Sequence, residues 1–168
     1  MNKFIINISK ELVEQNNLNE ILSLNEITED YGLTLAPEEA KSILITKKEA
    51  LKGNGRIEFG SGIEGKLIEK FKDSPYIGKH NYVETIKSLI EMFYYYKNET
   101  LEVISDDDLI EIMKEFFNGM CQGSLEILQN KVLCNIEWNI KHGTSDFKNI
   151  YDEEEEDAYG YEEEPDQY

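Results

Sequence analysis

The stretch NYVETIKSLIEMFYYYKNETLE, residues 81–102, decides the fold that this sequence predicts. A helix advances about 100° per residue. At that winding, four large side chains lie within about 40° of the Ile86 direction: Tyr82, Ile86, Ile90 and Phe93. One apolar face of this kind is typical of a helix that packs on a core. We therefore expect the longest helix of the chain here.

The three consecutive tyrosines of this helix diverge. Tyr94 and Tyr96 lie about 80° to either side of the apolar face, where a ring is usually buried and its hydroxyl reaches water. Tyr95 lies about 180° away, among polar residues, and is predicted to be a surface aromatic that needs another layer or a partner. Because the phenols diverge, we do not expect a catalytic cluster.

The rest of the body also has helical periodicity. Pro37 suits the first turn of a helix, and Gly53 suits its end. Only IINI (Ile5–Ile8) and RIEF (Arg56–Phe59) resemble strands, and two short segments do not form a sheet. The prediction is an all-α fold, a single compact domain of five or six helices. The further helices are expected at residues 17–30, Pro37–Gly53, Ile63–Phe71, Ser105 to Gly119 and Ser124 towards Gly143.

Composition limits the class of protein. The 168 residues are enough for one domain with its own core. Thirty-five acidic residues against 17 basic ones give a net charge of -18, which argues against nucleic-acid binding and against an anionic membrane surface. No apolar run approaches the roughly 20 residues of a membrane span, and the N-terminal apolar patch is too short for a signal peptide. We therefore expect a cytoplasmic protein.

The acidity is concentrated at the C-terminus. Residues 144–168 carry eleven acidic residues and one lysine, a net charge of -10. This segment has almost no aliphatic side chains, so it is predicted to be a disordered tail that either keeps the protein soluble or docks a basic partner. The expected organisation is an N-terminal segment (1–16), for which folding back on the body is one arrangement considered, a helical domain (17–143) and the tail (144–168).

Three glycines of FGSGIEG, Gly60, Gly62 and Gly65, have the GxGxxG spacing of a dinucleotide-binding turn. The context does not support that function, because no second parallel strand follows. Glu64 would also repel a phosphate. The favoured interpretation is a turn where helices approach closely. Arg56, Glu58, Gly60 and Gly62 remain the candidate ligand-binding residues.

Two cationic side chains, Arg56 and Lys97, have predicted anionic partners. Arg56 is the only arginine beside sixteen lysines. It is expected to serve a bidentate contact, either to an internal carboxylate or to an anionic ligand. Lys97 lies on the apolar side of its helix, and pairing with a carboxylate such as Asp73 or Asp108 is favoured over extension to solvent.

The two cysteines show no metal-binding spacing, and no cofactor or metal site is predicted. Cys121 precedes a predicted helix N-terminus, which would lower its thiol pKa. A nucleophilic thiol also needs a base, and neither histidine can be placed beside it. A structural role is therefore favoured for Cys121.

The last predicted helix has two apolar faces. Leu125, Val132, Ile136 and Ile140 form the core stripe. Ile127, Cys134 and Trp138 lie about opposite, so something must cover them. One cover is the N-terminal segment Phe4–Ile8, and the other is a homodimer or partner interface. Both predict a buried Trp138. Tyr95, Ile127, Cys134 and Trp138 are the candidate interaction surface.

Several motifs together resemble a family of small proteins from clostridia-like bacteria, known only as a domain of unknown function. They are RIEFG (56–60), DSPYI (73–77), FYYYKNET (93–100) and CQGSLE (121–126). The resemblance covers roughly residues 25–128. It implies a cytosolic single-domain protein and no activity.

Two functions are consistent with these patterns. The favoured one is a helical interaction module without chemistry, which binds another protein or a second copy of itself. The alternative is a small enzyme or anionic-ligand-binding protein that uses Arg56 and the glycine turn Gly60–Gly65. Convergence of Arg56, Glu58, Asp73 and Tyr95 on one cleft would favour the alternative.

Overall fold

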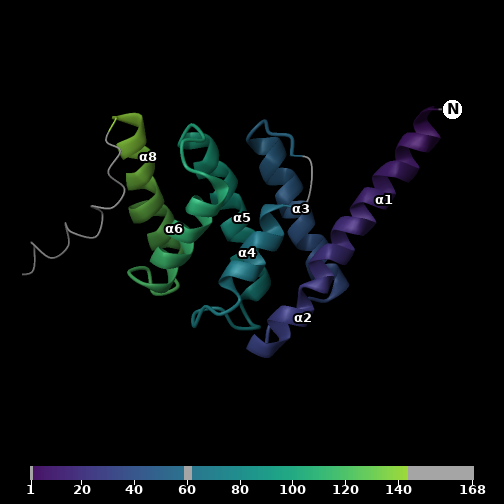
Figure 1. The fold of residues 1–168 in the computed structure, drawn as a ribbon, viewed down its shortest axis with the longest axis horizontal. Helices are drawn as coiled ribbons and strands as arrows, with labels where there is room; N and C mark the ends of the chain where they lie inside the picture. Colours follow the sequence, from purple (N-terminus) through teal and green to yellow (C-terminus); the bar gives the residue numbers. More distant parts are fainter. Residues whose placement is uncertain (1, 59–61, 144–168) are drawn as a thin grey trace, which may run out of the picture.

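The computed structural model describes residues 2–58 and 62–143. Within these ranges every regular element is helical, which confirms the all-α prediction (Figure 1). The predicted tail, residues 144–168, lies outside them. The elements are α1 (Asn2–Ser23), α2 (Asn25–Thr28), η1 (Glu29–Tyr31), α3 (Pro37–Gly53), α4 (Ile63–Phe71), α5 (Tyr82–Glu99), α6 (Asp106–Asn118), α7 (Leu125–Ile127), η2 (Leu128–Leu133) and α8 (Cys134–Lys141).

Helix α5 is the centre of the core, as its apolar face predicts. It packs against α3, α4 and α6, and Figure 1 shows it between α3 and α6. Ile86, Ile90 and Phe93 are buried along it. Phe71 of α4 and Phe117 of α6 meet edge to face beside it, with ring centroids 5.6 Å apart, a favourable aromatic geometry.

Local capping sets several helix boundaries. Pro37 begins α3, and the Glu39 carboxylate accepts a hydrogen bond from the Ala36 N–H at 2.7 Å. Ser105 caps α6, because its Oγ accepts from the Asp108 N–H at 3.1 Å. These contacts satisfy N–H groups that a first helical turn leaves without partners. The predicted bounds of α3 and α4 are confirmed.

The last helical run, α7–η2–α8, contains a π-helical turn at Leu128–Leu133. There the Cys134 N–H donates to the Gln129 carbonyl, five residues earlier. Val132 and Ile136 of the predicted core stripe are buried. The π turn also buries Leu128 and Leu133.

Helix α1 differs from the sequence-based expectation. Residues 5–8, which resemble a strand, and the whole segment 2–23 form one helix. Its N-terminal half extends away from the other helices, and α1 and α8 lie at opposite ends of the molecule (Figure 1). Because of this placement, the N-terminal segment does not cover Trp138, which was one of the two covers considered for it.

Candidate functional site

The four side chains that would define a catalytic cleft do not meet in the structure. Arg56 and Glu58 belong to the segment between α3 and α4. Asp73 lies in a groove between α4 and α6, 3.0 Å from Lys114 Nζ. Tyr95 lines a different groove beside α3. The geometric criterion for the enzyme hypothesis is therefore not met.

Arg56 pairs with a carboxylate of the same chain at the surface: its Nη1 lies 2.7 Å from Glu102, whose side chain is 61% exposed. Glu102 and its neighbour Leu101 have positive φ angles of 58° and 54°. This left-handed backbone is unfavourable for residues with a Cβ. It lets the Glu102 N–H donate to the Lys97 carbonyl at 3.1 Å, which ends α5. Of the two partners predicted for Arg56, the structure shows a carboxylate.

The glycine turn encloses a buried ion pair. Lys47 Nζ lies 2.7 Å from the Glu64 carboxylate, with only 11% and 5% of the two side chains exposed. A Cβ on Gly62 would lie 2.4 Å from Lys47 Nζ and 2.7 Å from Glu64 Oε2. Gly62 therefore allows close approach, and the Lys47–Glu64 pair fills the space facing it. Gly60 lies outside the described residues.

Tyr94 is fully buried beside this turn. Its hydroxyl donates to the Glu58 carboxylate, so the expectation of a water-exposed hydroxyl is wrong for Tyr94. Burial, followed by the nearby Glu58 carboxylate, raises the pKa of Tyr94 far above its ordinary value. Glu58 thus acts as an internal acceptor in this structure.

Lys97 is buried and ion-paired, as the winding of α5 predicts. Its Nζ lies 3.0 Å from the Asp106 carboxylate and also donates to the Ile104 carbonyl. The predicted partners, Asp73 and Asp108, were the wrong residues. Asp106 was missed because the chain turns between α5 and α6, and that path is not visible in helical periodicity.

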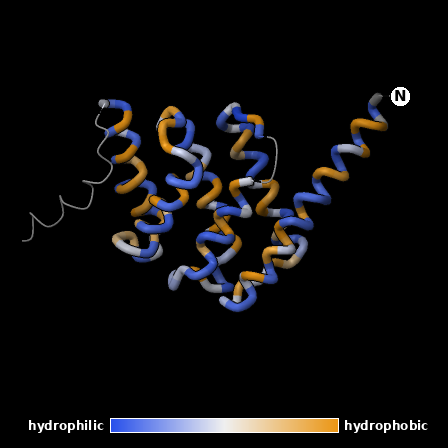
Figure 2. Tube along the Cα trace, viewed as in Figure 1, coloured by the Kyte–Doolittle hydropathy of each residue, from blue (hydrophilic) through white to orange (hydrophobic). Residues whose placement is uncertain are grey.

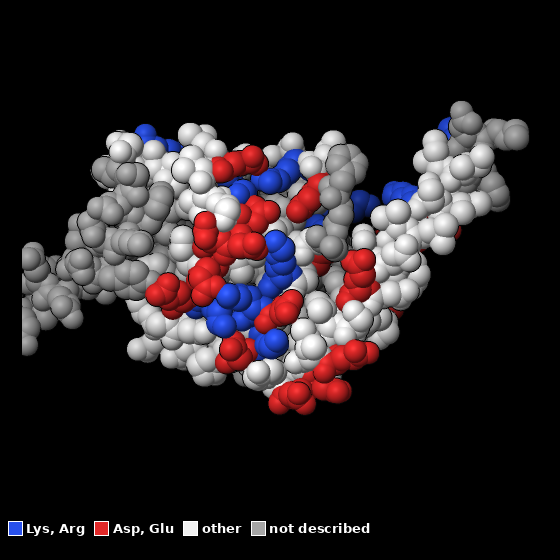
Figure 3. All heavy atoms as spheres, viewed as in Figure 1, with Lys and Arg blue, Asp and Glu red and all other residues white. Residues whose placement is uncertain are grey.

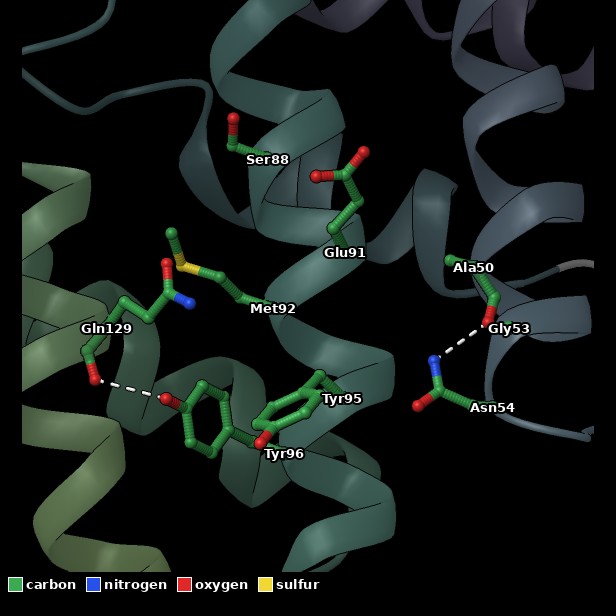
Figure 4. A pocket seen from close by; sticks show the side chains of 9 residues that line it. All are labelled: Ala50, Gly53, Asn54, Ser88, Glu91, Met92, Tyr95, Tyr96 and Gln129. Carbon is green, nitrogen blue, oxygen red and sulfur yellow. Dashed lines mark hydrogen bonds between the residues drawn. The ribbon is translucent and has the colours of Figure 1, made fainter.

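A groove of about 430 Å³ opens on the outer face of α5 (Figure 4). We call it the aromatic groove, because Tyr95 and Tyr96 form its lower part in that view. Asn54, at the end of α3, lies across from them, and the side-chain amide of Gln129 extends beside Met92. The full lining is Ala50, Gly53, Asn54, Ser88, Glu91, Met92, Tyr95, Tyr96 and Gln129.

The two tyrosines of the groove have different exposures. Tyr96 is buried, and its hydroxyl donates to the Gln129 carbonyl at 3.2 Å. Tyr95 is 45% exposed and rests edge to face on Tyr96, with ring centroids 4.9 Å apart. Partial desolvation, followed by the Glu137 and Glu99 carboxylates, raises the pKa of Tyr95. Glu137 of α8 and Glu99 at the end of α5 therefore lie near the Tyr95 hydroxyl, with Lys141 between them.

The second apolar stripe of the last helix does not form one face. Ile127 packs partly buried against the core, whereas Cys134 is exposed. The wider π turn between them changes the winding on which the stripe was predicted. Trp138 is 57% exposed and stacks on His142, with ring centroids 4.2 Å apart. The prediction of a buried Trp138 is wrong for this chain taken alone.

A second groove, of about 540 Å³, lies between α4 and α6 and is lined mainly by charged side chains. Figure 3 shows lysines interleaved with carboxylates on one face of the molecule. Lys66 Nζ lies 2.8 Å from Asp107, and Lys70 pairs with Glu111. Because neighbouring charges neutralise each other, this groove does not define an anion site.

Cys121 is buried, and burial raises its thiol pKa. The direction is therefore opposite to the lowering that was expected from a helix N-terminus, and its cause is desolvation. Across the described parts of the chain, no group of three or more His, Cys, Asp or Glu side chains is arranged to hold a metal ion. No helix there is both long and apolar enough to cross a membrane.

The fold and the groove define a small all-helical domain with an aromatic surface site. The chain belongs to a family of unknown function, DUF6323, whose model matches residues 20–146. This match confirms the expected membership of an uncharacterised family, while the bacterial source stays a prediction. No curated protein and no solved structure matches the chain.

Proposed function

We propose that the protein is a helical interaction module that binds a segment of another protein in the aromatic groove, without chemistry of its own. The observation that carries the proposal is the position of Tyr95. Its two neighbours on α5 are buried, yet Tyr95 is nearly half exposed beside a groove. The expected cytoplasmic location is part of the same proposal.

The groove has the composition of an interface centre. Tyrosine and methionine are enriched where proteins meet, and tyrosines are frequent among the residues that dominate binding energy. The Tyr95 ring already rests on Tyr96, so binding fixes little additional side-chain freedom. Burying the remaining exposed ring is therefore a net gain for a partner.

Charge indicates what the partner segment carries. Glu91 lines the groove and forms no ion pair with any residue that the structure describes. Glu99 and Glu137 lie on the other side of Tyr95, where Lys141 bridges them at 2.5 and 2.7 Å. The proposed partner segment presents an apolar side chain to Met92 and Tyr95 and a lysine or arginine to Glu91.

The test compares two exposed tyrosines. Partners captured from the native cell are purified, and their affinity is measured for wild type, Tyr95→Ala and Tyr31→Ala. Tyr31 is the matched control, because it is 50% exposed on η1, away from the groove. We expect Tyr95→Ala to weaken binding by at least about tenfold. Tyr31→Ala should change it less than about twofold.

A charge reversal tests the partner chemistry. Glu91→Lys should weaken the same complex, and raising the salt concentration should reduce the difference from wild type. A captured partner whose affinity is unchanged in both Tyr95→Ala and Glu91→Lys would refute binding in the aromatic groove.

A further inference from the structure

The N-terminal half of α1, residues 2–16, extends beyond the body, and we call it the arm (Figure 1). Every arm side chain that the structure describes is exposed. Figure 2 shows hydrophobic positions along it. Five large apolar side chains are between 45% and 62% exposed: Ile5, Ile6, Ile8, Leu12 and Val13.

These five side chains share the face that points away from the body. At about 100° per residue they lie within about 80° of a common direction. Leu18 and Ile21, which attach α1 to the core, point in roughly the opposite direction. The contact of Glu14 with Lys48 of α3, at 3.9 Å, marks the same body-facing side. The body therefore does not cover the apolar face.

An uncovered arm is energetically unfavourable. Its 15 residues form a helix of about 22 Å, a length at which isolated helices are marginal in water. Its apolar side chains would also remain hydrated. A partner that covers the apolar face would remove these side chains from water, and it would also stabilise the arm as a helix.

The charge of α1 changes sign along its length. Residues 2–10 contain Lys3 and Lys10 and no acid, for a net charge of +2. Residues 11–23 contain Glu11, Glu14 and Glu20 and no base, for a net charge of -3. The charges within the arm lie on the side of the helix away from the apolar face, so their effect on a pair of arms is long-range and screened by salt: it weakly favours antiparallel over parallel packing. Antiparallel helix dipoles add to this preference.

We propose that the arms of two copies of this chain pack antiparallel, apolar face to apolar face, in a homodimer. Ile5 of one arm contacts Leu12 of the other. The basic N-terminal end of each arm then lies alongside the part of the other arm that carries Glu11 and Glu14. Each arm exposes on the order of 500 Å² of apolar surface, so the pair buries at most about 1,000 Å². That area is at the lower limit of specific interfaces, and we expect a weak dimer with a dissociation constant in the micromolar range.

Two other occupants fit less well. The segment 144–168 of the same chain carries a net charge of -10 and almost no aliphatic side chains to cover the face. A membrane-surface helix has a strongly basic polar face. The arm has only two basic residues, Lys3 and Lys10. The whole chain has a net charge of -18, which opposes binding to an anionic bilayer.

Sedimentation velocity of the full chain over about 1–200 µM tests the proposal. We expect a concentration-dependent dimer. Ile5→Glu/Leu12→Glu should raise its dissociation constant at least about a hundredfold, because the new carboxylates would be buried. Both sites are exposed in the single chain, so circular dichroism should show that the body still folds. The matched control is Val103→Glu, at an apolar position 65% exposed after α5, which should leave the dimer unchanged.

Disulfide formation tests the orientation. In a Cys134→Ser background, Ile5→Cys and Leu12→Cys are made separately, so that only the buried Cys121 remains besides the new thiol. A cross-linked dimer should form when the two variants are mixed and not from either alone. Cross-linking of Ile5→Cys alone would show parallel arms and overturn the proposal. A wild type that stays monomeric throughout would also overturn it, as would arm-dependent binding to phosphatidylcholine–phosphatidylglycerol vesicles in place of self-association.

Discussion

Gly62 shows how one missing side chain permits a buried charge pair. Lys47 and Glu64 are nearly inaccessible to water, so each charge depends on the other for its solvation. Removing one partner would leave the other charge buried without compensation. A methyl group at position 62 would have to displace the pair. The three residues therefore act as one unit.

Lys47→Met should destabilise the fold by about 3–5 kcal/mol, because Glu64 would lose its counter-charge. Gly62→Ala should also destabilise it. The double variant Lys47→Met/Glu64→Leu should recover most of the loss, because no charge then stays buried. Urea unfolding at neutral pH measures all three free energies of unfolding.

Lys41→Met provides the control for that series. Lys41 forms an exposed ion pair with Glu38 at 3.1 Å, and such pairs contribute less than about 1 kcal/mol. If Lys47→Met were no more destabilising than Lys41→Met, the pair would not be buried in solution.

At the scale of elements, α5 places three successive tyrosines in three environments. Tyr94 bonds Glu58 inside the core, Tyr95 faces the aromatic groove, and Tyr96 bonds the Gln129 carbonyl. The divergence follows from the helical winding, and the sequence predicts it. The polar partners of Tyr94 and Tyr96 lie 36 and 33 residues away along the chain. Local periodicity therefore does not identify them.

The buried tyrosines predict a loss of stability at alkaline pH. Burial, followed by nearby anionic groups, raises the pKa of Tyr96 to about 12, and the pKa of Tyr94 is raised further. The folded state therefore keeps protons that the unfolded state loses above its pKa of about 10. The contribution of each group is fully present below pH 10 and is lost as the pH rises towards its folded pKa. Above pH 10 and below its folded-state pKa, each of the two tyrosines should lower the free energy of unfolding by about 1.4 kcal/mol per pH unit.

Urea unfolding at pH 8, 10, 11 and 11.5 measures this slope. Tyr96→Phe should flatten it, because the variant has no phenol proton at this position to lose on unfolding. The variant should still fold, since the ring stays packed and the Gln129 carbonyl keeps its bond from the Cys134 N–H. Tyr31→Phe, at an exposed site, is the control for the loss of a tyrosine hydroxyl. Equal slopes in wild type and Tyr96→Phe would contradict the assignment.

At the scale of the whole molecule, the described hydrophobic core and the most acidic segment lie in different parts of the sequence. The buried hydrophobic residues that the structure describes run from Leu18 to Ile136. Residues 144–168 carry -10 of the net charge of -18, which leaves -8 for residues 1–143. The buried hydrophobic residues that the structure describes therefore all precede the acidic segment in the sequence.

Truncation after Ser145 should leave the fold intact, with a melting temperature within a few degrees of the wild type. Removing ten net negative charges also reduces self-repulsion. Calorimetry of the full and truncated chains at matched salt concentration checks this. A decrease of more than a few degrees would show that the segment packs on the body.

The sequence by itself determined the helical class, most helix boundaries and the faces of α5. These properties are local, because capping and 3.6-residue periodicity act over a few neighbouring residues. The exposed position of Tyr95 belongs to this set, so part of the candidate site was predictable.

Only the tertiary structure decided which helices meet. It assigned Lys47 to Glu64 and Lys97 to Asp106, and it assembled the aromatic groove from three separate segments. It also left Trp138 exposed, because a π turn changed the winding of the last helix and α1 extended the other way. Each outcome depends on packing between residues distant in the chain, and helical periodicity does not report such contacts.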